Sequence, residues 1–351
     1  MKPAVYAERL LVWYDRAGRH DLPWQKPRTP YRVWLAEIML QQTQVATVIP
    51  YFQHFIARFP DVQALAAAAP DEVLAAWSGL GYYARARNLH AAARRIVGEL
   101  GGNWPQTLDG WLALPGIGRS TAGAVLAQAF GQRHAILDGN VRRVLARHTG
   151  IAGWPGVPAV ARELWTVAEQ RLPHRRLADY TQAQMDLGAL LCTARNPRCA
   201  ECPVAADCVA LRENHVAQLP TPRPRRERPR RVLELLLVGD GNGRWLLERR
   251  PPAGIWGGLW CPPLVETAQQ RQAWCVARGI TVSRWRRLAA VEHGFTHFQL
   301  EMRPRVACLT TAGRGARAAD DAARWLTVDE VLALGLPAPV RRLFVAELEK
   351  A

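Results

Sequence analysis

Four cysteines lie within one short stretch of the chain, at Cys192, Cys199, Cys202 and Cys208. They are separated by six, two and five residues, so the stretch holds a single Cys-x-x-Cys pair. Zinc ribbons and fingers use two separated close pairs, whereas an iron–sulfur cluster can take four thiolates from one loop. The spacing therefore favours an iron–sulfur cluster, and a zinc site or unligated thiols are the alternatives.

A glutamate on an otherwise apolar helix face is a candidate acid. Thr29 and Pro30 predict the start of a helix as N-cap and first helical residue. On that helix the neighbours of Glu37 include Trp34 and Leu40. Burial among them would raise the pKa of Glu37 and suit it to general acid catalysis. A structural ion pair with an arginine from elsewhere in the chain is the alternative.

A second carboxylate stands in residues 134–143, which read HAILDGNVRR. The segment predicts an extended stretch that leads into a helix, and either Asp138 or Asn140 fits as the N-cap. A catalytic interpretation pairs Asp138 with Glu37. Cleavage of an N-glycosidic bond needs a neutral acid to protonate the leaving base and an anionic carboxylate to stabilise the cationic sugar.

Residues 114–122, LPGIGRSTA, predict a tight turn between two helices. Gly116 and Gly118 leave the backbone N–H groups of the turn accessible, and the second helix begins there. Its N-terminal N–H groups and dipole form an anion site that needs no charged side chain. The pattern is typical of helix–hairpin–helix motifs that bind DNA phosphates, and a plain turn between helices is the alternative.

The segments that must position these residues are helical from about residue 6 to residue 213, since Ala, Leu and Arg dominate between short Gly/Pro breaks. Residues 219–231 hold four prolines and six arginines and predict a semi-rigid basic linker. Beyond it, residues 232–238 and 244–250 predict a β-hairpin, and residues 269–277 and 328–334 predict helices. We therefore expect a mainly α region over 1–218 and a smaller α/β domain over 232–351.

The composition points to a polyanionic partner. The 351 residues carry a net charge of +16, although an arginine-rich surface without a partner would give the same balance. The chain has no apolar run of 18 residues and no signal-peptide pattern at its start. We therefore expect no membrane association and an intracellular location, in the cytoplasm or nucleoid.

Together these motifs resemble MutY-type adenine DNA glycosylases, which belong to the endonuclease III, helix–hairpin–helix superfamily. The resemblance is close over residues 5–215 and looser beyond them. Besides the cysteines and the glycine turn, it rests on residues 22–24 (LPW), 34–45 (WLAEIMLQQTQV), 79–88 (GLGYYARARN) and 136–143 (ILDGNVRR).

The resemblance implies specific roles for the candidate residues. Glu37 would protonate adenine at N7 and help position the attacking water, Asp138 would stabilise or trap the oxocarbenium ion, and Asn140 would support this chemistry. The four cysteines would hold one [4Fe–4S] cluster. Superfamily members that are also lyases place a lysine nucleophile at position 120, so Ser120 implies a monofunctional, hydrolytic enzyme.

The resemblance also implies a substrate. This is double-stranded DNA in which adenine is mispaired with 8-oxoguanine or guanine, bound by a monomer. The extruded adenine would lie in a pocket, because the bond is not accessible inside the duplex. The residues implied to contact DNA or the adenine are Trp24, Gln41, Gln42, Tyr82, Gly116, Gly118, Ser120, Gln182, Phe295, Thr296 and His297.

The C-terminal domain resembles a Nudix-like domain. Residues 271–279, RQAWCVARG, occupy the position of the Nudix motif but lack the carboxylates that hold magnesium, so recognition and not hydrolysis is expected. In the family a Phe-Ser-His loop reads 8-oxoguanine, and here Phe295, Thr296 and His297 stand in its place. The alternatives are an oxidised-pyrimidine glycosylase/lyase of the endonuclease III type, a non-catalytic DNA-damage-binding protein, or a Nudix hydrolase tethered to DNA.

Overall fold

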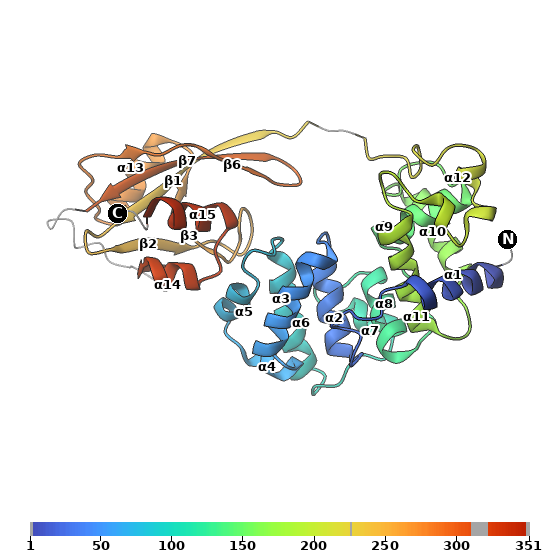
Figure 1. Ribbon diagram of the computed structural model, residues 1–351. Coiled ribbons are helices and arrows are strands. Elements are labelled where there is room, and N and C mark those ends of the chain that lie inside the picture. The colour runs from blue at the N-terminus through green and yellow to red at the C-terminus, as the bar shows by residue number, and fades with distance from the viewer. Residues whose placement is uncertain (1–2, 225–226, 310–321, 349–351) are drawn as a thin grey trace. The chain divides into compact units, whose positions relative to one another are not determined.

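The computed structural model describes residues 3–224, 227–309 and 322–348, and it divides into two compact units (Figure 1). The first unit comprises Met1–Ala67 and Asn88–Arg225, and the second comprises Ala68–Arg87 and Arg226–Ala351. Residues 225 and 226 of the predicted linker lie outside the described residues. The first unit is helical, whereas the second is built on a β-sheet.

The first unit consists of helices joined by short loops. Its α-helices are α1 (Pro3–Ala17), α2 (Pro30–Leu40), α3 (Val45–Arg58), α4 (Val62–Ala67), most of α6 (Ala84–Gly98), α7 (Leu108–Leu112), α8 (Arg119–Phe130), α9 (Gly139–Thr149), α10 (Pro158–Gln170), α11 (Leu177–Asp186) and α12 (Val209–Arg212). One π-helical turn, η1 (Leu187–Leu191), follows α11, and two 3₁₀ turns, η2 (Cys199–Glu201) and η3 (Ala205–Asp207), lie in the cysteine loop. The predicted helical N-terminal region is confirmed.

Helix α2 is apolar on nearly all sides because it is packed in the interior of the unit. It begins as the sequence predicts, with Pro30 in its first turn and the Thr29 hydroxyl accepting a hydrogen bond from the backbone N–H of Arg32. Trp34 is fully buried against Trp111. Helix α2 also packs against α8, which in turn packs against α11. This packing fixes the chain that carries Glu37.

The second unit contains a mixed sheet. Its strands are β1 (Arg230–Gly239), β2 (Arg244–Arg249), β3 (Trp260–Cys261), β4 (Leu264–Val265), β5 (Arg286–Arg287), β6 (Val291–Gly294), β7 (Gln299–Cys308) and β8 (Ala323–Thr327). The path through the sheet is β3-β2-β1-β7-β5, with β4 on β1, β6 on β7 and β8 on β2. Strands β1 and β7 run parallel at its centre, and β1 is buried from Leu233 onward. That burial explains its continuous apolar sequence.

Helices complete the second unit. They are α5 (Pro70–Ala76), α13 (Ala268–Ala277), α14 (Val328–Ala333), α15 (Ala338–Leu343) and a π-helical turn at Phe344–Leu348. The predicted hairpin is confirmed, since β1 and β2 pair antiparallel across a glycine-rich turn. Strand β1 starts two residues earlier than the sequence predicts, inside the proposed linker. Residues 68–87, which the sequence interpretation includes in the helical region, pack in this unit, where Asp71 accepts a hydrogen bond from Trp260.

Among the described residues, no helix is both long and apolar enough to cross a lipid bilayer.

Candidate active site

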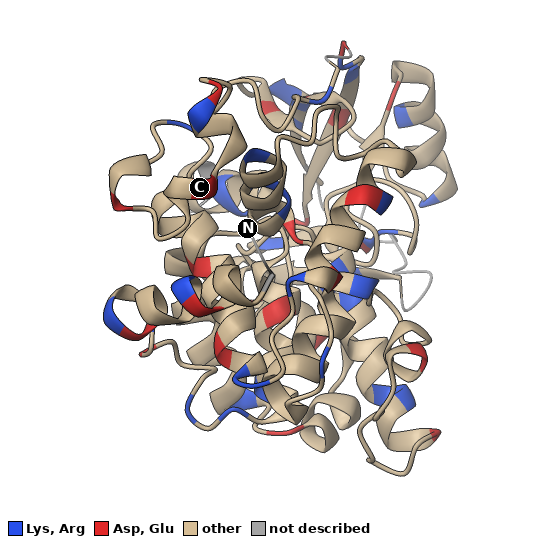
Figure 2. Cartoon of the chain, turned by 90° about the vertical axis from the view of Figure 1, so that its right-hand side faces the viewer, with Lys and Arg blue, Asp and Glu red and all other residues tan. Residues whose placement is uncertain are grey.

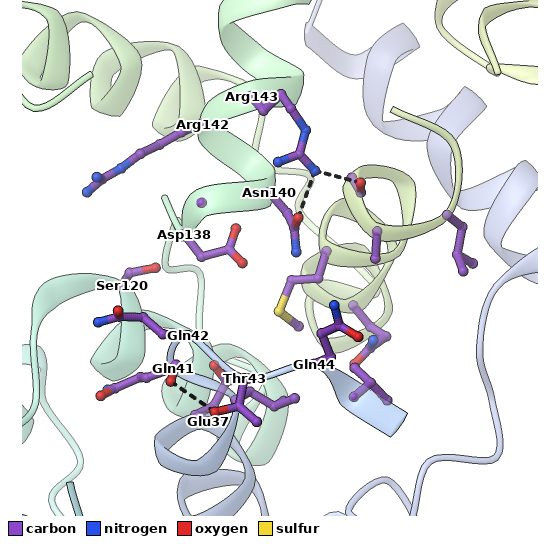
Figure 3. Close-up of a pocket in the computed structure, with 18 of the residues that line it drawn as sticks. Glu37, Gln41, Gln42, Thr43, Gln44, Ser120, Asp138, Asn140, Arg142 and Arg143 are labelled. Atoms are coloured by element: carbon purple, nitrogen blue, oxygen red, sulfur yellow. Dashed lines mark hydrogen bonds between the residues drawn. The ribbon is translucent and has the colours of Figure 1, made fainter. Parts of the chain in front are cut away.

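A pocket of about 990 Å³ opens in the first unit, within the size range of small-molecule sites. Its wall includes Glu37 from α2, Ser120 from α8, Asp138 and Asn140 at the start of α9, and Gln182 from α11. Figure 3 shows Glu37, Ser120, Asp138 and Asn140 around one space. The structure thus brings together the predicted catalytic residues from segments about 100 residues apart.

The surroundings of Glu37 raise the pKa of its carboxyl group. One of its oxygens, Oε1, accepts a hydrogen bond from Nε2 of Gln128 at 3.0 Å. Burial raises the pKa of Glu37 to about 7, and the negative charge of Asp138 adds to the increase while the Gln128 bond opposes it. Near neutral pH the group is therefore present in both the acid and the carboxylate form, which suits a general acid. The local sequence around Gln128 gives no sign of this contact.

Asp138 is both the N-cap of α9 and a wall of the pocket. Its Oδ1 accepts a hydrogen bond from the backbone N–H of Val141 at 2.7 Å. Burial raises its pKa, whereas the backbone N–H groups of the helix start and the guanidinium of Arg143 lower it. The two interpretations of Asp138 are thus compatible. The cap donors face the carboxylate and favour its charged form.

Asn140 does not act as the N-cap; its side chain is fixed by an arginine. Nη2 of Arg143 donates to Oδ1 of Asn140 at 2.8 Å and to the carbonyl of Gly188 at 2.7 Å (Figure 3). Nε of the same guanidinium donates to the backbone carbonyl of Cys192 at 2.7 Å. Arg143 therefore connects the pocket to the cysteine loop. The sequence shows an arginine here but gives no sign of this bridging position.

The glycine turn between α7 and α8 has the backbone that the sequence predicts. Gly116 adopts a φ of +77°, and a Cβ at this position would lie 2.7 Å from Cβ of Asn88. Gly118 is the N-cap residue of α8, so the N–H groups of the first turn are free of a side-chain cap. Ser120 lies in that turn, and its hydroxyl accepts a hydrogen bond from the backbone N–H of Leu137 at 3.0 Å. The serine thus also holds the segment that leads to Asp138.

The other base-contact candidates of the first unit also line the pocket. They are Trp24, Gln41, Gln42 and Gln182. Trp24 is 3% exposed and packs edge-on against Phe52. Gln42 adopts a left-handed backbone with a φ of +59°, directly after Gln41, the C-cap residue of α2. Such a conformation is strained for a non-glycine residue and is typical of functional positions.

The remaining DNA-contact candidates belong to the second unit. Tyr82 follows a glycine-rich turn, has a φ of +49° and is 50% exposed. Phe295 stacks on Phe298 at a centroid distance of 4.5 Å in the turn between β6 and β7. Thr296 and His297 occupy that turn and are exposed. The structure thus presents a threonine hydroxyl and an imidazole together at the end of a hairpin.

The four cysteines of the loop form a cluster around Cys202. The pKa of the Cys202 thiol is raised to about 11, mainly by burial and in part by the neighbouring thiolates of Cys192, Cys208 and Cys199. Nη1 of Arg147 lies 3.5 Å from Sγ of Cys192. Four sulfurs and a guanidinium in one place fit a ligand that removes the thiol protons and carries negative charge.

The helix at the Nudix-motif position carries no acidic side chain. Arg271 on α13 forms an ion pair with Glu234, whose other oxygen accepts hydrogen bonds from Arg305 at 2.6 and 3.0 Å. Trp274 on the same helix donates to Glu248 at 2.9 Å. The carboxylates of Glu234 and Glu248 are thus engaged by protein donors.

Comparisons with known proteins agree with this geometry. Residues 35–170 match the model of the HhH-GPD superfamily of base excision DNA repair proteins. Residues 192–208 match the iron–sulfur binding domain of endonuclease III, and residues 235–346 match the NUDIX domain. A thermostable thymine-DNA glycosylase has a similar structure, with a TM-score of 0.55 and 28% identity over 60% of this chain and 97% of that one. The pocket and fold therefore define a helix–hairpin–helix repair glycosylase with an iron–sulfur domain.

Relatives over the whole chain give the particular family. The adenine DNA glycosylase of Buchnera aphidicola (subspecies Schizaphis graminum) is 34% identical over 97% of each chain. The adenine DNA glycosylase of Homo sapiens is 34% identical over 95% of this chain and 72% of its own length. The chain belongs to the adenine DNA glycosylase family and is an enzyme of base excision repair with an iron–sulfur site, as the sequence motifs predict.

Proposed function

We propose that the protein hydrolyses the N-glycosidic bond of adenine mispaired with 8-oxoguanine or guanine in duplex DNA, and that it acts as a monomer on DNA of the nucleoid. The observation that carries this proposal is the pairing of two unlike carboxyl groups in one pocket. Glu37 has a pKa near 7, and burial raises the pKa of Asp138 as well, but at Asp138 the helix N–H groups and Arg143 oppose the increase and favour the charged form. Hydrolysis of a glycosidic bond needs this pair of protonation states.

The two carboxyl groups have separate roles. Glu37 gives its proton to N7 of the leaving adenine and, once ionised, orients the attacking water. Asp138 stabilises the positive charge that develops on the sugar, at the position where α9 begins. Asn140, fixed by Arg143, lies beside Asp138 in the pocket and keeps the sugar aligned with it. Ser120 supplies no amine for a Schiff base, so the sugar is released by water.

The DNA contacts follow from charge and backbone geometry. The N–H groups at the start of α8, where Gly118 supplies no side-chain cap, bind a phosphate. Lys and Arg residues occur in both units (Figure 2), and six of the 46 lie in the linker over residues 219–231. Trp24, Gln41 and Gln42 line the pocket that receives the extruded adenine. Tyr82 enters the base stack from its strained turn.

We further propose that the cofactor is one [4Fe–4S] cluster held by Cys192, Cys199, Cys202 and Cys208. When bound, it joins the four thiolates and so fixes the loop over residues 192–208. Arg147 supports this arrangement, because its guanidinium faces Cys192 Sγ and donates to the backbone carbonyl of Thr193 at 2.7 Å. The chain residues thus supply both the ligands and a compensating positive charge.

The C-terminal domain, over residues 232–351, supplies recognition of the opposite base. Adenine is a normal base, so a pocket that binds it cannot tell a mispair from a correct pair. 8-Oxoguanine differs from guanine by an added carbonyl and an N7–H, and the exposed Thr296 hydroxyl and His297 imidazole are suited to sense this edge. Phe295 holds their turn by stacking on Phe298.

The test is excision under single-turnover conditions. Duplexes with adenine opposite 8-oxoguanine, adenine opposite guanine, and thymine glycol are incubated with the full chain and then cleaved with alkali. We expect cleavage of the first two substrates and none of the third. Cleavage of thymine glycol alone would assign the chain to the oxidised-pyrimidine enzymes instead. In the Thr296→Ala/His297→Ala double variant, the preference for 8-oxoguanine should fall by about 1–3 kcal/mol, as for lost base contacts.

A further inference from the structure

A buried hydrogen-bond network lies behind the pocket at the end of α11. The carboxylate of Asp186 has no exposed surface. It accepts four hydrogen bonds: from the backbone N–H of Arg19 at 2.7 Å, from Nε and Nη2 of Arg19 at 2.9 and 2.6 Å, and from Nε2 of Gln182 at 2.8 Å. Arg19 and Gln182 line the pocket, whereas Asp186 does not.

This network determines which way the Gln182 amide faces. A carboxylate paired with a guanidinium only accepts hydrogen bonds, so the amide atom that meets Asp186 must be the NH₂ group. The carbonyl oxygen of Gln182 must then face the other way. The residue is 2% exposed, and among the described residues its Oε1 is buried and has no hydrogen-bond partner.

An unpaired buried acceptor in a pocket wall favours a ligand with a matching donor. Leaving such an oxygen unpaired is costly, and a donor from the ligand removes that cost. Adenine has an exocyclic amino group at C6, whereas hypoxanthine and guanine have a carbonyl oxygen there. An oxygen facing the Gln182 oxygen would be repelled, since neither atom can donate.

We propose that Asp186, held by Arg19, is a positioning residue that fixes the Gln182 carbonyl toward the pocket and so selects bases with an exocyclic amino group. The proposal deepens the proposed adenine glycosylase function and rests on it. Asp186 acts only through Gln182 and does not touch the base. The predicted consequence is a change in substrate preference and not merely in rate.

The experiment compares excision of adenine and hypoxanthine opposite the same guanine, with kcat/KM measured for each. In the Asp186→Asn variant, the new amide can donate to the Gln182 oxygen and allow its amide to turn over. We expect the adenine-to-hypoxanthine ratio to fall by about tenfold or more, the size expected for one lost buried hydrogen bond. Asp179→Asn is the matched control. It lies on the same helix, pairs with the exposed Arg176, and should leave the ratio unchanged.

Two further variants keep the proposal testable if Asp186→Asn folds poorly. Gln182→Leu removes the acceptor, so it should lower the ratio by itself, and Asp186→Asn should add no further change in that background. Arg19→Lys keeps the charge but loses the paired guanidinium contacts, and should lower the ratio less. Equal losses for both bases in all these variants would overturn the proposal. If the unaltered enzyme excised no adenine at all, the proposed function itself would fail.

Discussion

Arg143 donates a hydrogen bond to the backbone carbonyl of Cys192, and the same guanidinium holds the side chain of Asn140. A pocket residue and a cysteine of the loop over residues 192–208 are therefore separated by one side chain. We expect Arg143→Gln to lower single-turnover excision by about tenfold, because Asn140 and the loop lose a shared charged donor. Arg142→Gln is the control, since it removes the same charge from the neighbouring residue. Equal rate losses in the two variants would contradict the bridging role of Arg143.

Glu37→Gln should lower the single-turnover rate by at least about 100-fold, the usual contribution of a general acid. Mispair affinity should stay nearly unchanged, because the amide has the same shape and removes a buried negative charge. A gel-shift titration beside the kinetic assay separates the two effects. Substantial excision by this variant would exclude Glu37 as the acid.

The pKa of about 7 at Glu37 predicts a pH dependence with a definite sign. The acid form is populated below this pKa and is lost as the pH rises through it, so excision should decline between about pH 6 and pH 8. The raised pKa also means that the folded state holds its proton more tightly than the unfolded state. The stability that this proton contributes should therefore be lost as the pH rises from about 4.5 to about 7, and Glu37→Gln should raise the Tm at pH 8 relative to the unaltered chain.

Purified protein should be brown and contain about four irons per chain if the four thiolates hold a [4Fe–4S] cluster. Cys199→Ser should reduce iron content and DNA affinity together, because the loop between the ligands carries two arginines, Arg195 and Arg198. Cys261→Ser is a suitable control, since this cysteine lies buried in the sheet unit. Stoichiometric zinc without visible absorption would show that the metal assignment is wrong.

Borohydride should not trap a covalent complex with DNA during turnover. Position 120 is a serine whose hydroxyl is already engaged by the backbone N–H of Leu137. Ser120→Lys would introduce the missing amine, and trapping should then appear if the sugar carbon lies within its reach. Efficient trapping by the unaltered chain would place it among the bifunctional enzymes.

The sequence predicted those parts of the site that depend on local pattern. The N-cap at Thr29, the turn at Gly116 and the acidic residue on an apolar helix face are all properties of neighbours within a few positions. The bond from Gln128 to Glu37 joins residues 91 positions apart, and the pairing of Arg19 with Asp186 spans 167. Such contacts depend on how helices pack, and no spacing rule along the chain reveals them.

The sheet shows the same difference between features set by local sequence and contacts between distant segments. The β1–β2 hairpin follows from a glycine turn between two apolar runs, whereas the parallel pairing of β1 with β7 joins distant segments. Asp138 shows a further limit, because a cap and a catalytic carboxylate are the same residue type in the same local sequence. Both interpretations describe one side chain, and only the position of the pocket shows that they are compatible.

Asp138 caps the start of α9, so one substitution at this position would change both the proposed chemistry of the site and the stability of the helix. Replacing it with alanine would remove the negative charge and also free the Val141 N–H, so a loss of activity could not be assigned to either cause. Asparagine keeps an oxygen that can accept this bond while removing the charge. Most random substitutions of Asp138 would therefore lower activity without revealing the cause. Asp138→Asn separates the loss of negative charge from the loss of the helix cap.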